Sequence, residues 1–513
     1  MADFDLAIIG GGINGAGIAR DAAGRGLKVV VVEQGDLASG ASSASSKLID
    51  GGWCNLERGA LRLVRASLRE REVLLRLAPH LVRPLRFVLP FDAERRSPMR
   101  VRLGLLAYDW LGWRKSLPGT RTLDLITDPA GQPLRRHFQH AYEYSDCFAD
   151  DARLVVLNAV DAAERGAIIR TRTRCVRAER AADSWRLILN ARGQRDVVTA
   201  RALVNAAGPW VDIVAETVVR RPLTRPLRLD RGSHILVPRL YDQGWAYVLQ
   251  AADGRAVHVI PFAHDFTLIG TTEQSFVGDP TAAAPTVGEI SYLCDVINDY
   301  FRATLGATDV VWAFAGVRAN PETGAGKLRN VEGRHALILD RHSGAPLLTV
   351  VGGRLTTYRR LAEEVLSRLA HVFPRSRPWT ARRPLPGGDF ANDGAPAFLE
   401  RTRHRWPFLA EDHARRLVDA YGTRIESVLQ TATRPEDLGM RFGGDLTATE
   451  VTYLMRKEWA QTADDVLWRR SKLGLRFSEA QRTALEDFMA QANSRAAAGA
   501  DAPPSSAGGN GTR

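Results

Sequence analysis

Residues 5–33 contain a short apolar run, a glycine-rich turn, a helix-like segment and a second apolar run that ends at Glu33. The glycines Gly10, Gly12 and Gly15 have the spacing G-x-G-x-x-G. This order of elements predicts a βαβ unit that binds a dinucleotide. We expect the pyrophosphate at the helix N-terminus, where unpaired amides and the helix dipole favour negative charge.

Each residue of this motif has a separate predicted role. Gly10 permits the tight turn between strand and helix, Gly12 leaves room for the pyrophosphate, and Gly15 lets the helix pack close to the sheet. Glu33 is placed to accept hydrogen bonds from ribose hydroxyls, and its charge would repel a 2′-phosphate. The motif therefore predicts an adenine dinucleotide ligand.

A serine-rich segment follows the acidic residue, at residues 39–57. Short hydroxyl side chains allow close backbone approach, so Ser42, Ser45 and Ser46 are expected to contact a phosphate or ribityl chain. Lys47 follows directly and is one of only six lysines in the chain. The alternative is a solvated serine-rich loop, but the position after the second strand favours contact with the cofactor.

The 513 residues are enough for two or three domains. Lys and Arg number 70 against 58 Asp and Glu, which gives a net charge of +12. This charge favours anionic lipid surfaces or an anionic substrate. It does not favour nucleic acid, because the charge is spread out and no zinc-binding, helix-turn-helix or RNA-reading motif is present.

The four cysteines, Cys54, Cys147, Cys175 and Cys294, are far apart and contain no C-x-x-C pair. This spacing predicts isolated thiols in a reduced compartment and no metal cluster. We expect no signal peptide, because the N-terminus runs almost straight into the first strand. We expect no membrane span, because no run approaches the roughly 18 apolar residues that a span requires. The sequence therefore predicts a soluble or peripheral protein.

Two amphipathic patterns follow in the first third of the chain. Residues 62–77 have helical spacing, and Pro79 ends the pattern. Residues 99–115 place an apolar and aromatic stretch between basic ends. This stretch either lies in a membrane interface, with Trp110 and Trp113 at headgroup level, or forms a buried helix with basic ends.

From residue 142 to about residue 350 the pattern is one of alternating strands and turns. An apolar strand ends at Asn205-Ala-Ala-Gly208 and is expected to return to the dinucleotide-binding sheet. A later apolar strand ends at Gly352-Gly353, and a helix is predicted to begin near Thr356. This second turn repeats the anion-binding geometry of the first.

The motifs GGGINGAGIARDAAGRGL, SSASSKLI, NAAGPWVD, GSHILVP, GVR and GGRLTTYRRLAEE resemble the aerobic, FAD-dependent glycerol-3-phosphate dehydrogenases. The resemblance covers nearly the whole chain in order. It implies FAD, a quinone acceptor, and oxidation of sn-glycerol 3-phosphate to dihydroxyacetone phosphate. It also implies a cytoplasmic protein held peripherally at the inner face of the cell membrane.

The resemblance implies an α/β fold with a Rossmann-like FAD-binding domain, an interleaved mixed β-sheet substrate domain and a C-terminal helical cap-like domain. The FAD-binding domain is expected at 1–80, 142–225 and 330–375, and the substrate domain at 81–141 and 226–329. A linker at 376–395, a helical domain at 396–492 and a disordered tail at 493–513 complete the predicted order. We also consider a homodimer formed through the helical domain.

The resemblance also assigns site residues. His234 matches the family's histidine for proton handling or substrate orientation, and Arg318 matches an arginine that contacts the substrate anion. The residues expected to bind the cofactor share glycine turns and small polar side chains: Gly10, Gly12, Asn14, Gly15, Glu33, Ser42, Ser45, Ser46, Lys47, Gly208, Gly353, Arg354, Leu355 and Thr356.

The chain departs from the family pattern near the expected substrate. Where the family usually has His, Arg and Tyr, this chain has Asp50, Cys54 and Asn55. Arg354 replaces a lysine, and arginine is a bulkier, planar donor. Each lost charge-assisted contact would weaken phosphate binding by ~1.5–3 kcal/mol.

Three hypotheses follow from these departures. The first is a glycerol-3-phosphate dehydrogenase with a weakened or rearranged substrate site, whose expected residues are Asp50, Cys54, Asn55 and Arg318. The second is a flavoenzyme of the same scaffold that oxidises another small alcohol or an amine, because a carboxylate at Asp50 would attract a cation. The third is a non-catalytic flavin-binding protein.

Overall fold

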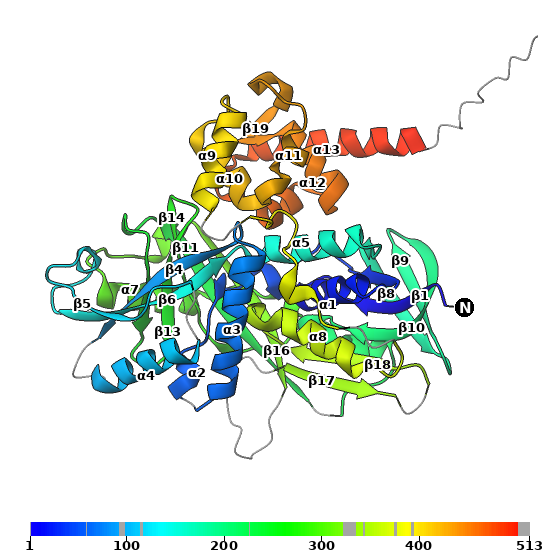
Figure 1. Ribbon diagram of the computed structural model, residues 1–513, viewed down its shortest axis with the longest axis horizontal. Coiled ribbons are helices and arrows are strands. Elements are labelled where there is room, and N and C mark those ends of the chain that lie inside the picture. The colour runs from blue at the N-terminus through cyan, green and yellow to red at the C-terminus, as the bar shows by residue number, and fades with distance from the viewer. Residues whose placement is uncertain are drawn as a thin grey trace, which may run out of the picture.

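The computed structural model describes residues 2–57, 59–91, 98–112, 116–224, 226–321, 335–341, 344–373, 377–390 and 394–500. Two sheets with their covering helices form one body, and a helical lobe near the C-terminus, coloured yellow to red, lies above it in Figure 1. The predicted fold class, an α/β FAD-binding fold with a mixed-sheet domain and a C-terminal helical domain, is confirmed.

The first sheet contains the predicted βαβ unit. Strand β1 runs parallel to β2 on one side and to β10 on the other. Within the described residues the strand order is β17-β18-β10-β1-β2-β7, and β8 and β9 extend from β10. The strands are β1 Phe4–Ile9, β2 Val29–Val32, β7 Ile168–Arg170, β8 Thr173–Arg180, β9 Trp185–Ala191, β10 Gln194–Asn205, β17 His335–Asp340 and β18 Leu347–Gly352.

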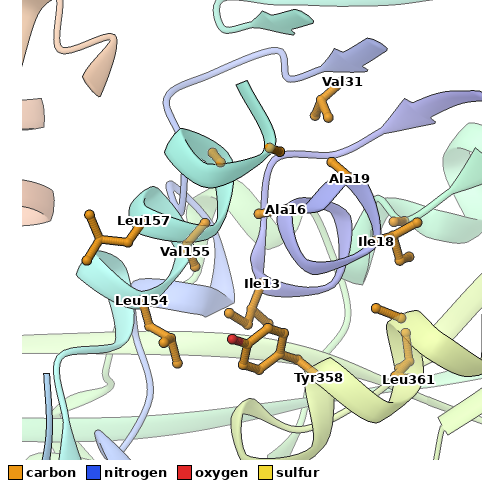
Figure 2. Close-up of a cluster of buried hydrophobic side chains, with 14 of the residues drawn as sticks. Ile13, Ala16, Ile18, Ala19, Val31, Leu154, Val155, Leu157, Tyr358 and Leu361 are labelled. Atoms are coloured by element: carbon orange, nitrogen blue, oxygen red, sulfur yellow. The ribbon is translucent and has the colours of Figure 1, made fainter. Parts of the chain in front are cut away.

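Helix α1, Ile13–Gly24, packs between α5, Asp151–Glu164, and α8, Tyr358–Arg368. Figure 2 shows Ile13 beside Tyr358, with Leu154 and Val155 of α5 next to them. A Cβ at Gly17 would lie 2.6 Å from the ring of Tyr358, so this glycine permits the close helix contact. These contacts fix the N-terminus of α1 against the sheet.

The second sheet is mixed and has the order β15-β11-β14-β13-β12-β4-β6-β3 in the described part of the chain, with β16 on β11 and β5 on β6. Its strands are β3 Leu48–Ile49, β4 Val82–Phe91, β5 Arg121–Asp124, β6 His140–Ala149, β11 Leu227–Pro238, β12 Ala246–Gln250, β13 Ala256–Phe262, β14 Phe266–Gly270, β15 Gln274–Ser275 and β16 Trp312–Pro321.

One predicted domain boundary differs from the observed sheets. Residues 142–149 were expected in the FAD-binding part, but they belong to β6 of the second sheet. The reason is that β6 pairs with β4 from Val82–Ala149 to Phe91–His140, a long-range register that the local sequence does not encode. The first sheet therefore resumes only after β6.

Helices cover the second sheet and form the upper lobe. Around the sheets lie α2 Cys54–Glu57, α3 Leu61–Leu77, α4 Pro98–Leu111, α6 Val211–Ile213 and α7 Val287–Tyr300. The lobe contains α9 Ala395–Arg405, α10 Glu411–Tyr421, α11 Ile425–Leu429, α12 Ala448–Glu458 and α13 Glu479–Ala500, with a small hairpin of β19 Arg441–Gly443 and β20 Leu446–Thr447.

Helix α13 corrects the prediction of a disordered tail at 493–513. It continues to Ala500, because the alanine-rich sequence after Ser494 has high helix propensity. Residues 501–513 lie outside the described residues. The amphipathic helix predicted at 62–77 is α3, which ends before Pro79.

Buried ion pairs join the lobe to the FAD-binding part. Arg153 of α5 bonds to Glu458 at the end of α12, and both side chains are at most 1% exposed. Arg470 donates two hydrogen bonds of 2.9 Å to Asp36, which follows the first βαβ unit. Arg153 also donates to the carbonyl oxygen of Ala420, Arg470 to that of Glu458, and Arg469 bonds to Asp36 as well. This buried charge network couples the stability of the lobe to that of the body.

Candidate functional site

A cavity of about 910 Å³ extends from the glycine-rich turn of the first sheet to the inner face of the second sheet. Its lining includes residues from β1, β2, β6, β13, β16 and β18. Ligand sites in open α/β sheets lie beyond the carboxyl ends of parallel strands, and this cavity has that position for β1 and β10.

The first glycine turn has the geometry that the motif predicts. Gly10 has a φ of +113°, and a Cβ there would lie 2.5 Å from the carbonyl oxygen of Ala206. A Cβ at Gly15 would lie 1.9 Å from the carbonyl oxygen of Gly10. A Cβ at Gly12 would meet only Ser42 Oγ, at 3.0 Å, so Gly12 is the glycine that leaves space for a ligand.

Glu33 and Ser42 hold the loops around this turn. The amides of Gly11 and Gly35 donate to the Glu33 carboxylate at 2.6 and 2.7 Å, and the amide of Ile13 donates to Ser42 Oγ at 3.0 Å. Burial raises the pKa of the Glu33 carboxyl, and the two amides oppose this. Ser42 thus accepts the hydrogen bond of the first amide of α1. The side chains of Glu33 and Ser42 also line the cavity.

The second glycine turn lies against the first. Asn14 Nδ2 donates to the carbonyl oxygen of Gly352 at 3.0 Å, and Gly352 and Gly353 have φ values of +73° and +104°. Asn14 Oδ1 is buried and has no hydrogen-bond partner among the described residues. Both turns therefore present backbone to one cavity, as a long ligand with several polar groups requires.

Most of the predicted cofactor residues line this cavity. They are Gly10, Gly12, Asn14, Glu33, Ser42, Ser45, Ser46, Gly208, Gly353, Arg354, Leu355 and Thr356. Gly15 and Lys47 are not in the lining. Gly15 packs against Gly10, and Lys47 Nζ is buried 2.9 Å from the carboxylate of Asp151.

Of the two predicted catalytic residues, Arg318 lines the cavity and His234 does not. Arg318 is exposed, and its guanidinium makes no ion pair or hydrogen bond with the described residues. His234 is 3% exposed, stacks on Phe314, and shares a hydrogen bond of 2.9 Å between its Nε2 and Ser46 Oγ. Burial, with Lys47 and Arg318, lowers the pKa of His234 to about 3.

A second histidine, His258, lines the cavity and was not predicted. His234 and His258 are both paired with Gly270, on opposite sides of β14, so their side chains lie on the same face of the sheet. Burial lowers the pKa of His258, while Asp50 and the Gly270 carbonyl raise it. The available sequence signal was a polar residue between Val257 and Val259 in an apolar strand.

The residues that depart from the family pattern meet at the same cavity. Asp50 Oδ1 accepts a hydrogen bond of 2.7 Å from Arg354 Nη2. Asn55 and Arg354 approach each other at Gly52, where a Cβ would lie 2.8 Å from Asn55 Nδ2 and 2.9 Å from Arg354 Nη1. The side chain of Cys54 lies outside the described part of the chain, as do residues 322–334.

No group of three or more His, Cys, Asp or Glu side chains among the described residues is arranged to hold a metal ion. Cys147, Cys175 and Cys294 are buried free thiols. In the described ranges, every helix is either too short or too polar to cross a bilayer.

Comparison with known proteins gives the family. A family model described as FAD dependent oxidoreductase matches residues 5–359, and one described as C-terminal domain of alpha-glycerophosphate oxidase matches residues 378–496. The glycerol-3-phosphate dehydrogenase of Pseudomonas aeruginosa is 47% identical over 489 residues, covering 95% of each chain. The chain belongs to the FAD-dependent glycerol-3-phosphate dehydrogenase family.

Two further proteins are similar to this chain over nearly its whole length. The D-erythritol 1-phosphate dehydrogenase of Brucella abortus is also 47% identical, over 95% of this chain and 98% of its own. The structure of the glycerol-3-phosphate dehydrogenase from Bacillus halodurans complexed with FAD has a TM-score of 0.74 and 25% identity, and covers 95% of this chain and 94% of that one.

The cofactor of this family member is FAD, and the residues present fit it. The space beside Gly12 admits a pyrophosphate at the N-terminus of α1. Glu33 lines the cavity beside this turn, and residues 353–356 line the same cavity.

Proposed function

We propose that this protein oxidises a secondary hydroxyl of a phosphorylated polyol, with sn-glycerol 3-phosphate going to dihydroxyacetone phosphate, and passes the electrons to a quinone. The observation that carries the proposal is the free guanidinium of Arg318 in the cavity that also contains the FAD-binding turns. The identity to glycerol-3-phosphate and D-erythritol 1-phosphate dehydrogenases supports it.

Arg318 is the proposed phosphate contact. A guanidinium has a planar set of donors that matches phosphate oxygens, and a charge-assisted pair of this kind is stronger than a neutral hydrogen bond. Arg318 lies on β16, whose register pairs it with Asp230, but the Asp230 carboxylate bonds to Arg228 and Asn320 instead. The charge of Arg318 is thus available to a substrate anion.

His258 is the proposed acceptor of the hydroxyl proton. Burial holds its pKa below the ordinary value, so the ring is neutral near pH 7 and has a nitrogen lone pair. His258 Nδ1 has no hydrogen-bond partner among the described residues. When bound, FAD accepts the hydride equivalent that leaves the carbinol carbon, so that the alcohol loses one proton and one hydride to become a ketone.

His234, which the family resemblance assigns to proton handling or substrate orientation, is held in place by its neighbours. It is held by Ser46 and stacked on Phe314, and a Cβ at Gly270 would lie 2.3 Å from its ring. Burial, with the nearby charges of Lys47 and Arg318, lowers the pKa of His234, so its ring is neutral near pH 7. We therefore assign it to positioning the Ser45–Ser46 segment.

The amine alternative loses its main support. Its premise was a free carboxylate at Asp50, but Arg354 neutralises that carboxylate. A cationic substrate would meet a paired charge at Asp50 and an unpaired cation at Arg318.

Peripheral contact with the inner face of the membrane is part of the proposal. Met99, Leu103, Leu106 and Trp110 repeat every three or four residues along α4 and are 47–75% exposed. The exposed Arg100 and Arg102 lie on the same helix. An apolar stripe beside basic residues suits an anionic lipid surface, where a quinone is reached. Trp113 lies outside the described residues, and a homodimer through the lobe stays a prediction.

A steady-state assay with an artificial electron acceptor tests the proposed activity. Glycerol 3-phosphate and D-erythritol 1-phosphate are the substrates, and free glycerol is the control without phosphate. We expect turnover with at least one of the two phosphorylated substrates and little turnover with free glycerol. Arg318→Gln should lower kcat/KM by 10- to 100-fold, because a charged hydrogen bond contributes about 1.5–3 kcal/mol. Equal rates with free glycerol and with the phosphorylated substrates would contradict the proposal.

A further inference from the structure

We propose that Asp50, Asn55 and Arg354 form a subsite for hydroxyl groups at one end of the cavity, and that it selects phosphorylated polyols of four or more carbons over three-carbon ones. This inference rests on the proposed function, since it concerns the same cavity.

The first step concerns charge. Arg354 and Asp50 form an ion pair of 2.7 Å, with side chains that are 20% and 23% exposed. The pair has no net charge, so this end of the cavity offers little attraction to a dianionic phosphate, and the Asp50 carboxylate opposes one. The phosphate is therefore directed to Arg318, and the uncharged end of the substrate to Asp50 and Arg354.

The second step concerns donors and acceptors. Arg354 Nη1 and Asn55 Oδ1 are both buried and have no hydrogen-bond partner among the described residues. The first is a donor and the second an acceptor, and both side chains lie against Gly52. A hydroxyl group both donates and accepts, so it can satisfy either atom. A phosphate oxygen can only accept, and it would leave Asn55 Oδ1 unsatisfied.

The third step concerns the number of hydroxyls. Apart from the hydroxyl that is oxidised, glycerol 3-phosphate has one hydroxyl and a four-carbon polyol 1-phosphate has two. Two unsatisfied buried atoms, together with the second oxygen of Asp50, match the longer substrate better. A buried polar atom left without a partner costs about 1–3 kcal/mol, which is enough to discriminate between the substrates.

The backbone around the subsite keeps these side chains in place. Thr356 Oγ1 accepts a hydrogen bond of 3.2 Å from the amide of Asp50, which ties the segment to the second glycine turn. The amide of Gly51 donates to the buried Tyr108 hydroxyl at 2.7 Å, and Tyr108 bonds to Asp146. The subsite is thus preorganised by buried contacts on both sides of Asp50.

The ratio of kcat/KM for D-erythritol 1-phosphate to that for glycerol 3-phosphate tests this inference. We expect a ratio of about ten or more for the holoenzyme. Asn55→Ala should lower the ratio by about tenfold, since the unmatched acceptor is removed. Asn320→Ala is the matched control, because Asn320 also lines the cavity but donates its amide to Asp230 at 2.7 Å, and its ratio should not change.

A ratio at or below one, or an unchanged ratio in Asn55→Ala, would overturn the subsite. The holoenzyme ratio alone decides the matter if Asn55→Ala does not fold, as judged from flavin content. Failure of the proposed function would give a different result, because then neither glycerol 3-phosphate nor D-erythritol 1-phosphate would support turnover.

Discussion

Arg354 Nη2 lies 2.7 Å from Asp50 Oδ1, although the two residues are 304 positions apart in the chain. Arg354 follows the second glycine turn, and Asp50 follows the short strand β3, so the pair joins these two segments at the wall of the cavity. Both residues depart from the family pattern, but only the carboxylate of Asp50 is a new charge, because Arg354 replaces a lysine. The two charges compensate each other, so the carboxylate of Asp50 is neutralised by Arg354 at the cavity wall.

Asp50→Asn should make the cavity attract anions more strongly. The substitution removes the charge that neutralises Arg354, so inorganic phosphate should become a better competitive inhibitor, with a Ki lower by about tenfold. Steady-state inhibition by inorganic phosphate measures this. The double variant Asp50→Asn with Arg354→Gln should return the Ki toward that of the wild type. An unchanged Ki in the single variant would show that Arg354 does not face the ligand.

Gly12→Val should prevent FAD binding without unfolding the protein. The backbone of Gly12 has φ −82° and ψ −173°, which any residue adopts, and its Cβ would contact only Ser42 Oγ. The valine methyls would occupy the pyrophosphate position. We expect at least tenfold weaker flavin binding, measured by the ratio of absorbance at 450 and 280 nm after purification. Gly244→Val is the control, because a Cβ there meets nothing within 4 Å.

Glu458→Gln should destabilise the junction of lobe and body. Arg153 would remain buried without its charged partner, and breaking such a pair costs about 3–5 kcal/mol. Urea unfolding measures the loss. Glu426→Gln breaks the pair with Arg405, in which both side chains are more than half exposed, and should cost less than about 1 kcal/mol. Equal effects of the two variants would contradict the proposed role of the buried pair.

Buried histidines should make the protein less stable as the pH falls below 6.5. Burial lowers the pKa of His80 and of His234 to about 3, so the unfolded chain binds protons between pH 6.5 and 3 that the folded chain does not. Each histidine then costs about 1.4 kcal/mol of stability per pH unit in this window.

Urea unfolding of His80→Leu between pH 4.5 and 7 measures this effect. The variant should lose stability with falling pH less steeply than the wild type. His371→Leu removes an exposed histidine and should leave the slope unchanged. Parallel curves for the wild type and His80→Leu would show that His80 is protonated in the folded state.

Replacing the apolar stripe of α4 should weaken membrane binding. Leu103→Ser with Trp110→Ser removes two side chains that are 58% and 75% exposed, and sedimentation with vesicles containing anionic lipid should fall at least tenfold. Val277→Ser is the control, because Val277 is 95% exposed at a different place in the chain. Equal loss in both proteins, or none in either, would rule out α4 as the contact.

Local backbone chemistry allowed the sequence to predict the two glycine turns that line the cavity. Gly10, Gly12, Glu33 and the Gly352-Gly353 turn are fixed by short-range rules about turns and helix ends, and each lines the cavity or shapes it. FAD, the family and the fold class are confirmed. The roles of the individual site residues stay predictions that the experiments above address.

Long-range pairing explains what the sequence did not predict. His258 reaches the cavity because β13 pairs with β14, and the Asp50–Arg354 pair joins two residues that are 304 positions apart in the chain. The same cause moves β6 into the second sheet. Helix α13 extends into the expected tail because alanine-rich sequence at a helix end continues the helix.

The absorbance spectrum of the purified protein under anaerobic conditions tests the central claim most directly. The account predicts a flavin spectrum that bleaches when glycerol 3-phosphate or D-erythritol 1-phosphate is added and does not bleach with free glycerol. A flavin spectrum that neither phosphate alters, or one that an amine bleaches instead, would contradict it.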